Sequence, residues 1–347
     1  MPLDSEVMSA PTEQAPAALT EQRKIPEFFL VGHAKCGTTA LYEMLRRHPQ
    51  IHMPDYKGGS GKEPWYFSRD NPNPQTTSER SIAFTGRKSV TFEEYLSLFE
   101  AARPGQLIGE ASTSYLWSPV AATRIAEVRP DARIIAIIRE PASFLRSLHL
   151  QLLMNHHEAE KSFRKAVELD QPRREGRDIP PYAYWPAALI YSDRVRYVEQ
   201  LRRYEEAFGR ERMLVLIYDD FRNDNEATVR RVLRFLEVDD SHPIEAIEAN
   251  PTIGVRSPRL DDLKHSLRSG ETPALRAMRG ALKTLSTPGI RKHLLYPLQR
   301  RVVYSKPPPP DEAFMRELRL RFKDEVIALS DYMDRDLVGL WGYDRLG

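Results

Sequence analysis

The chain has 347 residues, of which 41% are hydrophobic, so it can bury one large α/β core or two small ones. Its 51 lysines and arginines balance 49 acidic residues to a net charge of +2, so no nucleic-acid partner is indicated for the chain as a whole. The single cysteine, Cys36, excludes an internal disulfide framework.

The N-terminal residues 1–24 lack both an early basic region and an apolar core. We expect a disordered leader there and not a signal peptide. No apolar run approaches the roughly 20 residues that a transmembrane helix needs, so we predict no transmembrane segment. A single cysteine suits a reducing compartment. We therefore expect a cytoplasmic protein with one enzyme-sized domain over residues 25–347.

Strand-like apolar runs recur along the chain with helix-period segments between them. This alternation is typical of a doubly wound α/β fold, so we predict one domain with a central, mostly parallel sheet flanked by helices. The predicted strands are EFFLV (27–31), QLIGEAS (106–112), ARIIAIIR (132–139) and RMLVLIY (212–218). Helices are predicted over 91–102, over 225–238 and, as one last amphipathic helix, over 311–333.

Two segments outside this framework stand out by composition. Residues 55–80 are rich in Gly, Pro, Asn and Ser, which indicates a loop, and loops of that length tend to be functional. Residues 263–310 carry ten Lys/Arg against one acid, Glu271. We expect this segment to be a basic helical insertion or extension packed on the core. Contact with an acidic acceptor or a peripheral membrane surface would be secondary.

The loop after the first strand, in FFLVGHAKCGTTALYEML (28–45), has an unusual lysine position. Gly32 and Gly37 keep the spacing of the nucleotide-binding P-loop, but Thr38 occupies the lysine position and Lys35 lies three residues upstream. Backbone amides of such a turn and of the following helix converge on one point, where an anion binds. We predict a phosphate-binding loop; the alternative is a glycine turn that only connects strand and helix.

This loop, together with KEPWYFS (62–68), resembles the 5′-phosphosulfate loop of sulfotransferases that use 3′-phosphoadenosine 5′-phosphosulfate (PAPS). The usual pattern is PKxGTT; Ala34 replaces the common proline and Cys36 the common serine. The resemblance implies a P-loop-like fold and transfer of a sulfuryl group from PAPS to a hydroxyl, with no metal required. It also implies that the donor is bound by Lys35, Cys36, Gly37, Thr38 and Thr39, with Lys35 on the bridging and leaving oxygens.

The resemblance runs from about residue 26 to 342, and residues 306–341 are similar to the C-terminus of bacterial members. It implies that Arg139 and Ser147 bind the 3′-phosphate, that Tyr218 lies by the adenine and that Arg256 belongs to a basic loop over the 3′-phosphate. For Arg139 the alternative is a surface ion pair with Glu140. Ala40 stands where the cytosolic enzymes have a tryptophan, so how the adenine stacks stays open.

A base must take the proton of the acceptor hydroxyl. Glu63 lies in a Lys-Glu-Pro setting that resembles the one around the base of carbohydrate-type sulfotransferases; the cytosolic Lys-Thr-His setting is absent from the sequence. We therefore assign Glu63 as the base, with Glu110 and His33 as alternatives. A structural ion pair between Lys62 and Glu63 is the other interpretation. His149 is interpreted as a structural histidine.

Two other functions are alternatives to sulfuryl transfer. A P-loop kinase or NTPase would need lysine at position 38 and an aspartate for Mg²⁺ at the end of a second strand. A non-enzymatic basic module that binds membranes or nucleic acid would have no use for a phosphate loop. The acceptor of a sulfotransferase would be a hydroxyl of a carbohydrate or of a secondary metabolite, because the aromatic residues of YAYWP (182–186) suit both.

Overall fold

The computed structural model describes residues 24–54, 63–68, 91–181, 183, 185–245, 254–255, 304–305 and 307–346. Its strands are β1 (Phe28–Leu30), β2 (Ile51–His52), β3 (Leu107–Ala111), β4 (Arg133–Ile138), β5 (Met213–Ile217), β6 (Gly254–Val255) and β7 (Tyr304–Ser305). Its α-helices are α1 (Thr38–Arg46), α3 (Phe92–Leu96), α4 (Ala121–Val128), α5 (Pro141–Met154), α6 (Phe163–Glu168), α7 (Asp170–Arg174), α8 (Tyr191–Arg194), α9 (Tyr197–Phe208), α10 (Tyr218–Asn223), α11 (Asn225–Leu236), α16 (Glu312–Arg321), α17 (Lys323–Met333) and α18 (Leu337–Leu340). Short 3₁₀ turns are η2 (Tyr66–Ser68), η3 (Ser97–Phe99), η4 (Pro186–Leu189), η5 (Arg210–Arg212) and η7 (Tyr343–Arg345).

The central sheet has five parallel strands in the order β2-β3-β1-β4-β5. This order confirms the predicted α/β fold. The chain leaves β1 toward the β2 edge, returns through β3 and then crosses to β4 and β5 on the other side. In such doubly wound sheets ligands bind beyond the carboxyl ends of the strands, near the strand where the direction of winding changes. The loop after β1 lies at that place.

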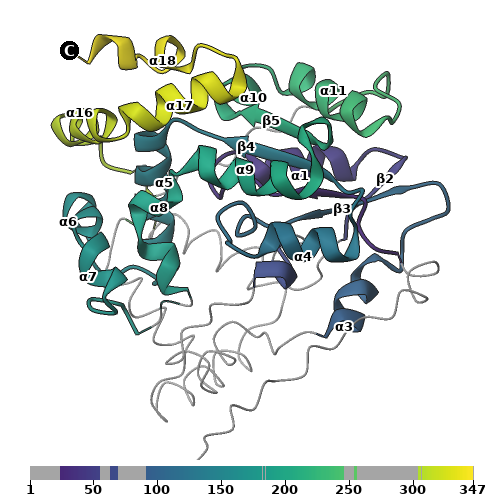
Figure 1. Cartoon of the computed structure of the whole chain (residues 1–347), viewed down its shortest axis with the longest axis horizontal. Helices are drawn as coiled ribbons and strands as arrows, with labels where there is room; N and C mark the ends of the chain where they lie inside the picture. The colour runs from purple at the N-terminus through teal and green to yellow at the C-terminus, as the bar shows by residue number, and fades with distance from the viewer. Residues whose placement is uncertain are drawn as a thin grey trace, which may run out of the picture.

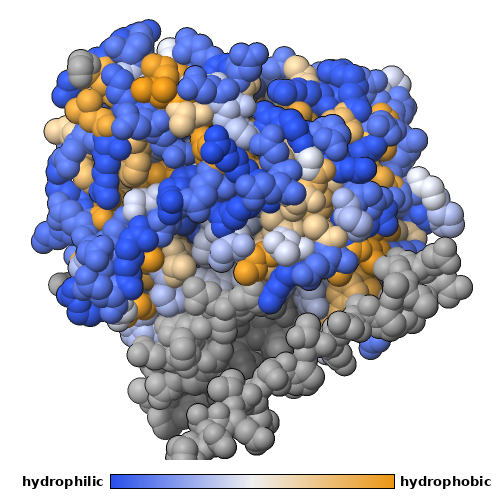
Figure 2. Space-filling model, viewed as in Figure 1, coloured by the Kyte–Doolittle hydropathy of each residue, from blue (hydrophilic) through white to orange (hydrophobic). Residues whose placement is uncertain are grey.

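Helices cover the sheet on both faces (Figure 1). Connections between parallel strands are right-handed, so those that run toward opposite edges of the sheet place their helices on opposite faces of it. Helices α4 and α9 pack against each other, and α1 packs against α11. Helix α17 also packs against α9, and α16 packs on α5. Hydrophilic residues predominate on the surface that these helices present in Figure 2, with scattered hydrophobic patches.

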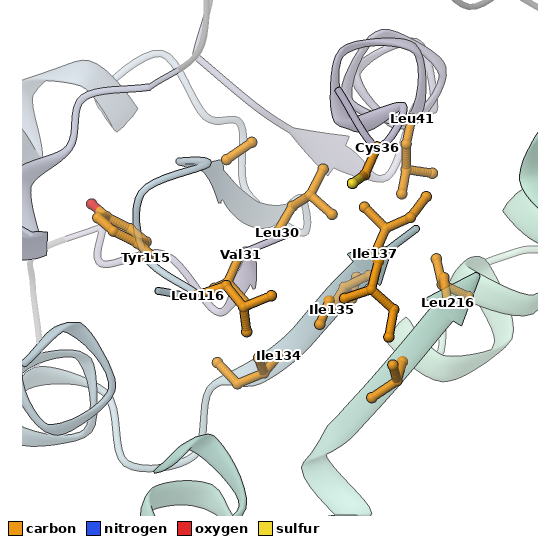
Figure 3. Close-up of a cluster of buried hydrophobic side chains, with 14 of the residues drawn as sticks. Leu30, Val31, Cys36, Leu41, Tyr115, Leu116, Ile134, Ile135, Ile137 and Leu216 are labelled. Carbon is orange, nitrogen blue, oxygen red and sulfur yellow. The ribbon is translucent and has the colours of Figure 1, made fainter. Parts of the chain in front are cut away.

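Strand β4 shows why the sequence forms this core. Its run RIIAII is β-branched and apolar, and Ile134 to Ile138 are all buried, as expected of a strand covered on both faces. Ile134 and Ile135 lie beside Leu30 and Val31 from the β1 region in the cluster of Figure 3. Helix α5 begins directly afterwards, because Pro141 occupies its first turn and the Glu140 side chain accepts hydrogen bonds from the Ala142 and Ser143 amides.

The structure corrects some details of the sequence reading. The predicted last helix is two helices, α16 and α17, with a break at Phe322, whose φ is −105°. The short strands β2, β6 and β7 were not predicted. Of the basic segment 263–310, only 304–305 and 307–310 are described, and residues 1–23 lie outside the described part, so these predictions stay predictions. Within the described ranges, no helix combines the length and apolarity that crossing a bilayer requires.

Candidate active site

The loop between β1 and α1 depends on its two glycines. A Cβ atom at Gly32 would lie 2.7 Å from both the backbone nitrogen and oxygen of Ile137, so only glycine lets the loop start this close to β4. Gly37 has a φ of 85° and precedes the first residue of α1. Gly37 has no side chain to cap the first amides of α1, and the first turn holds no acidic residue. These amides therefore suit an anionic ligand.

Lys35, Arg139 and Tyr218 converge at this loop from three different elements. Arg139 directly follows β4 and donates a hydrogen bond from Nη1 to the Lys35 carbonyl oxygen at 3.3 Å. Its guanidinium lies 4.8 Å from the ring centroid of Tyr218, the first residue of α10. A Cβ at Gly37 would lie 3.3 Å from the Tyr218 ring, so this tyrosine also borders the loop. The structure thus places a cation and an aromatic ring against the loop that carries Lys35.

Two cations share this small volume. Burial lowers the pKa of Lys35 below its ordinary value, and the nearby Arg139 guanidinium lowers it further. Lys35 also has a φ of 67°, a conformation that side-chain-bearing residues rarely adopt. Strained backbone and crowded positive charge both persist only where surrounding structure enforces them, and both are common at functional sites. A bound anion would relieve the repulsion between the two cations.

Glu140, the alternative partner of Arg139, is engaged elsewhere. Besides capping α5, its carboxylate accepts a hydrogen bond from the Tyr343 hydroxyl at 2.6 Å and lies 3.7 Å from Arg319. No ion pair joins Arg139 to Glu140 among the described contacts. The Arg139 guanidinium is therefore not paired with the Glu140 carboxylate.

The other residues predicted for the donor-binding loop differ in how far their side chains are buried. The Cys36 side chain lies in the core beside Leu41 and Ile137 (Figure 3), and burial raises the pKa of its thiol to about 12. Only its backbone is left to face a ligand. Thr38 is buried at the start of α1, whereas Thr39 is exposed.

Ser147 lies on α5, the helix that begins two residues after Arg139, and is 3% exposed. Helix α5 also holds the structural histidine. His149 Nδ1 is 2.8 Å from the Tyr191 hydroxyl and its Nε2 is 3.3 Å from the Lys161 carbonyl oxygen, which confirms that His149 is a satisfied structural residue. Arg256 and Lys62 lie outside the described residues, so their predicted roles stay predictions.

Glu63 sits in a second strained segment, next to the end of β3. Its backbone amide donates to the Ala111 carbonyl oxygen at 2.8 Å. Its carboxylate accepts a hydrogen bond from the Trp65 indole at 3.0 Å, and the Trp65 amide donates to the Ser112 hydroxyl at 3.1 Å. The φ angles of Glu63 and Trp65 are 76° and 54°. The Glu63 side chain is thus held in a defined position on a strained turn.

Glu110, the alternative base, is fully buried beneath this turn. Its carboxylate accepts hydrogen bonds from Ser112 at 2.6 Å, Tyr115 at 2.8 Å and Tyr95 at 2.9 Å. The Ser112 hydroxyl that donates to Glu110 also accepts from the Trp65 amide. This network fits a residue that positions the Glu63–Trp65 turn better than one that meets an acceptor.

The ionisation of Glu110 makes the stability of the protein depend on pH. Burial raises its pKa to about 7, although the hydrogen bonds from Ser112, Tyr115 and Tyr95 favour the charged form. Because this pKa lies above the ordinary value of 4.5, the folded state holds the proton more tightly, and this residue's contribution to the free energy of unfolding falls as pH rises from about 4.5 to 7. Glu110→Gln should flatten that slope in urea unfolding at a series of pH values. If the free energy of unfolding changed equally with pH in the wild-type and Glu110→Gln proteins, Glu110 would not have a raised pKa.

His33, the other alternative base, has both ring nitrogens occupied. The side-chain nitrogen of Gln200 donates a hydrogen bond to the Asp193 carbonyl oxygen at 2.8 Å. The side-chain oxygen of Gln200 therefore faces His33 and accepts a hydrogen bond from its Nε2 at 2.8 Å. His33 Nδ1 then accepts from Arg194 at 3.4 Å. Burial and the Arg194 charge lower the pKa of His33 well below its usual value. Neither nitrogen is positioned to accept a proton from an acceptor.

Comparison with known proteins agrees with this geometry. A family model described as "Sulfotransferase family" matches residues 26–242. Mouse carbohydrate sulfotransferase 15 is 24% identical over 262 residues, which cover 62% of this chain and 44% of that protein. Human heparan sulfate glucosamine 3-O-sulfotransferase 6 is 31% identical over 132 residues, which cover 38% of this chain and 32% of that protein. The matches thus span less than half of either relative.

Among solved structures, a sulfotransferase from Alicyclobacillus acidocaldarius shares the fold. Its TM-score is 0.60 at 23% identity, and the alignment covers 91% of this chain and 98% of that one. This likeness confirms the predicted P-loop-like architecture. The family model alone covers more than half of the chain, from residue 26 to 242, and the chain therefore belongs to the sulfotransferase family.

Proposed function

We propose that this protein transfers the sulfuryl group of PAPS to a hydroxyl of a carbohydrate acceptor. The observation that carries the proposal is the contact between Arg139 and Lys35, which brings a guanidinium onto the glycine loop beside the uncapped start of α1. A donor with phosphate at one end and phosphosulfate at the other needs two cationic points, and Lys35 on the loop and Arg139 after β4 supply them. The family match supports the same chemistry.

The residues have separate tasks in the proposed reaction. The acceptor oxygen attacks the sulfur in line while the bond from sulfur to the bridging oxygen of the donor breaks. Glu63 takes the proton of the attacking hydroxyl, and adenosine 3′,5′-bisphosphate leaves. Lys35 stabilises the negative charge that develops on the bridging oxygen, which is where a preorganised cation lowers the barrier most. Arg139 and Ser147 hold the 3′-phosphate, away from the reacting sulfur.

The choice of a carbohydrate acceptor rests on two supports. The two relatives compared above are named as carbohydrate and heparan sulfate sulfotransferases. In the structure, the Trp65 ring that donates to Glu63 lies 5.1 Å from the Trp185 ring, so aromatic surface borders the proposed base. Sugars stack on such rings. We place the enzyme in the cytoplasm, as its composition suggests.

The proposal is tested by incubating the purified protein with ³⁵S-labelled PAPS and a panel of hydroxyl acceptors. The panel contains mono- and oligosaccharides, phenols and alcohols. We expect label on a saccharide hydroxyl and release of adenosine 3′,5′-bisphosphate. Label transfer from γ-³²P ATP, in a parallel reaction with Mg²⁺, would instead support the kinase alternative and overturn the proposal.

Arg139→Ala should weaken binding of adenosine 3′,5′-bisphosphate by about 2–3 kcal/mol, the scale of a hydrogen bond to a charged group. Adenosine 5′-phosphosulfate, which lacks the 3′-phosphate, should lose much less affinity when both are measured by calorimetry. Arg234→Ala is the control, because Arg234 is an exposed arginine of α11 that pairs with Asp240. Equal losses for the two nucleotides would show that Arg139 does not bind the 3′-phosphate.

A further inference from the structure

A cavity lies close to both the β1–α1 loop and the turn that carries Glu63. It has a volume of about 440 Å³ and is bordered by the residues after β3, by η4 and by the start of α9; its walls include Ser68, Trp117, Trp185, Arg194 and Arg203. Arg194 connects it to the donor loop, because it donates to His33. Trp185 connects it to the proposed base, because its ring packs on Trp65, which hydrogen-bonds Glu63.

Arg194 has an unusual environment for a guanidinium. It is 3% exposed and lies 4.2 Å from the Trp117 ring centroid, and its Nε atom has no hydrogen-bond partner. Within the described ranges, no carboxylate lies within ion-pair distance of it. The cavity's two acids are already engaged: Asp193 by Arg174 at 2.7 Å, and Glu199 by Arg196.

A buried charge without a counterion is costly, and the stacking on Trp117 offsets only part of that cost. Burial lowers the pKa of Arg194 to about 9, so the guanidinium still carries its charge at neutral pH. Nε is enclosed by protein and Nη2 donates to His33, but Arg194 lines the cavity, and its terminal N–H groups match a carboxylate. An anionic ligand in the cavity would supply the missing counterion.

The rest of the wall is aromatic. The Trp117 and Trp185 ring centroids are 6.0 Å apart with an interplanar angle of 81°. Two indoles at nearly right angles form a corner that accepts the apolar face of a ring-shaped ligand. Arg203, at the same cavity, is a second arginine for which the described contacts give no carboxylate partner. The cavity therefore combines ring-binding surface with net positive charge.

We propose that this cavity binds the acceptor through a sugar ring that carries a carboxylate, with the Arg194 guanidinium on the carboxylate and Trp117 and Trp185 on the ring. Arg194 is then the residue that selects acidic over neutral sugars. This inference rests on the proposed function, because it names the class of acceptor for that transfer. The cavity wall contacts the donor loop through His33 and the residue that hydrogen-bonds Glu63 through Trp65.

The test compares methyl β-D-glucuronide with methyl β-D-glucoside, which differ by a carboxylate, in titrations followed by tryptophan fluorescence. The wild-type protein should bind the glucuronide about 10-fold to 100-fold more tightly, the effect of one charge-assisted contact. Arg194→Met should remove this preference, and Arg194→Lys, which keeps the charge and loses the fork, should reduce it. Arg202→Met is the control, because Arg202 is an exposed arginine of α9 outside the cavity wall.

Equal affinity of the wild-type protein for the two glycosides would overturn the inference. This comparison uses only the wild-type protein, so it does not depend on whether a variant folds. An equal loss of preference in Arg202→Met and Arg194→Met would overturn it as well. Because these titrations contain no PAPS, they are independent of the transfer reaction. Glucuronide preference without any sulfuryl transfer would support this site while refuting the proposed function. Transfer from PAPS without glucuronide preference would refute the site alone.

Discussion

Glu63→Gln should lower turnover by about 10²–10⁴-fold, the range ascribed to loss of a general base. The glutamine side-chain oxygen can still accept the hydrogen bond that the Trp65 indole donates, and the backbone bond from residue 63 to Ala111 is untouched. The turn and the donor site should therefore persist while basicity is lost. Steady-state kinetics should show this fall in kcat, whereas the affinity for adenosine 3′,5′-bisphosphate should stay at the wild-type value.

Two variants separate Glu63 from the alternative bases. Glu110→Gln removes the buried carboxylate that Ser112 and two tyrosines contact, and His33→Asn removes the ring between Arg194 and Gln200. If either were the base, the acidic limb of the pH profile of kcat would vanish in that variant and persist in Glu63→Gln. Near wild-type turnover of Glu63→Gln, with loss of turnover in one of the others, would reassign the base.

Lys35→Ala should reduce turnover by about 10²-fold or more, as expected for the loss of one charge contact in the transition state. Donor affinity should fall less, because Arg139 and the amides at the start of α1 remain. Lys35→Gln keeps most of the side-chain length and should show the same loss, which would assign the effect to charge and not to volume. Unchanged kcat in a folded Lys35→Ala protein would remove Lys35 from the mechanism.

The sequence was sufficient to predict the main strands for a simple reason. Strands β4 and β5 consist almost entirely of apolar residues, and a strand buried on both faces requires such a run. Strand β2 has only two residues, Ile51 and His52, and its pairing with β3 comes from distant parts of the chain. The break at Phe322 was missed because its flanks keep a helical pattern on both sides.

The site was predictable only where its residues are contiguous. Gly32, Lys35 and Gly37 form one loop, so their chemistry can be recognised from the sequence. The convergence of Arg139 and Tyr218 on that loop was expected from the family resemblance alone, because those residues are more than 100 positions away. Arg194 was missed, because its place beside His33 and Trp117 depends on contacts that no local pattern signals.

The role of Glu110 also could not be predicted from the sequence around it. In the sequence it is one acidic residue in IGEAS, and a catalytic role was a reasonable alternative. Its burial and the hydroxyl groups of Tyr95, Ser112 and Tyr115 around it come from the packing of α3 and the loop after β3 on the sheet. Burial and hydrogen bonding determine whether a carboxylate meets a substrate or supports a turn, and both are properties of the folded chain.

The loop from Gly32 to Thr39, with Arg139, should bind a nucleotide that carries phosphates on both its 3′ and 5′ positions. Passing the protein over immobilised adenosine 3′,5′-bisphosphate measures this binding. We expect the protein to be retained, free adenosine 3′,5′-bisphosphate to elute it, and ATP with Mg²⁺ at the same concentration not to elute it. Failure to bind, or elution by ATP and the bisphosphate alike, would contradict this expectation.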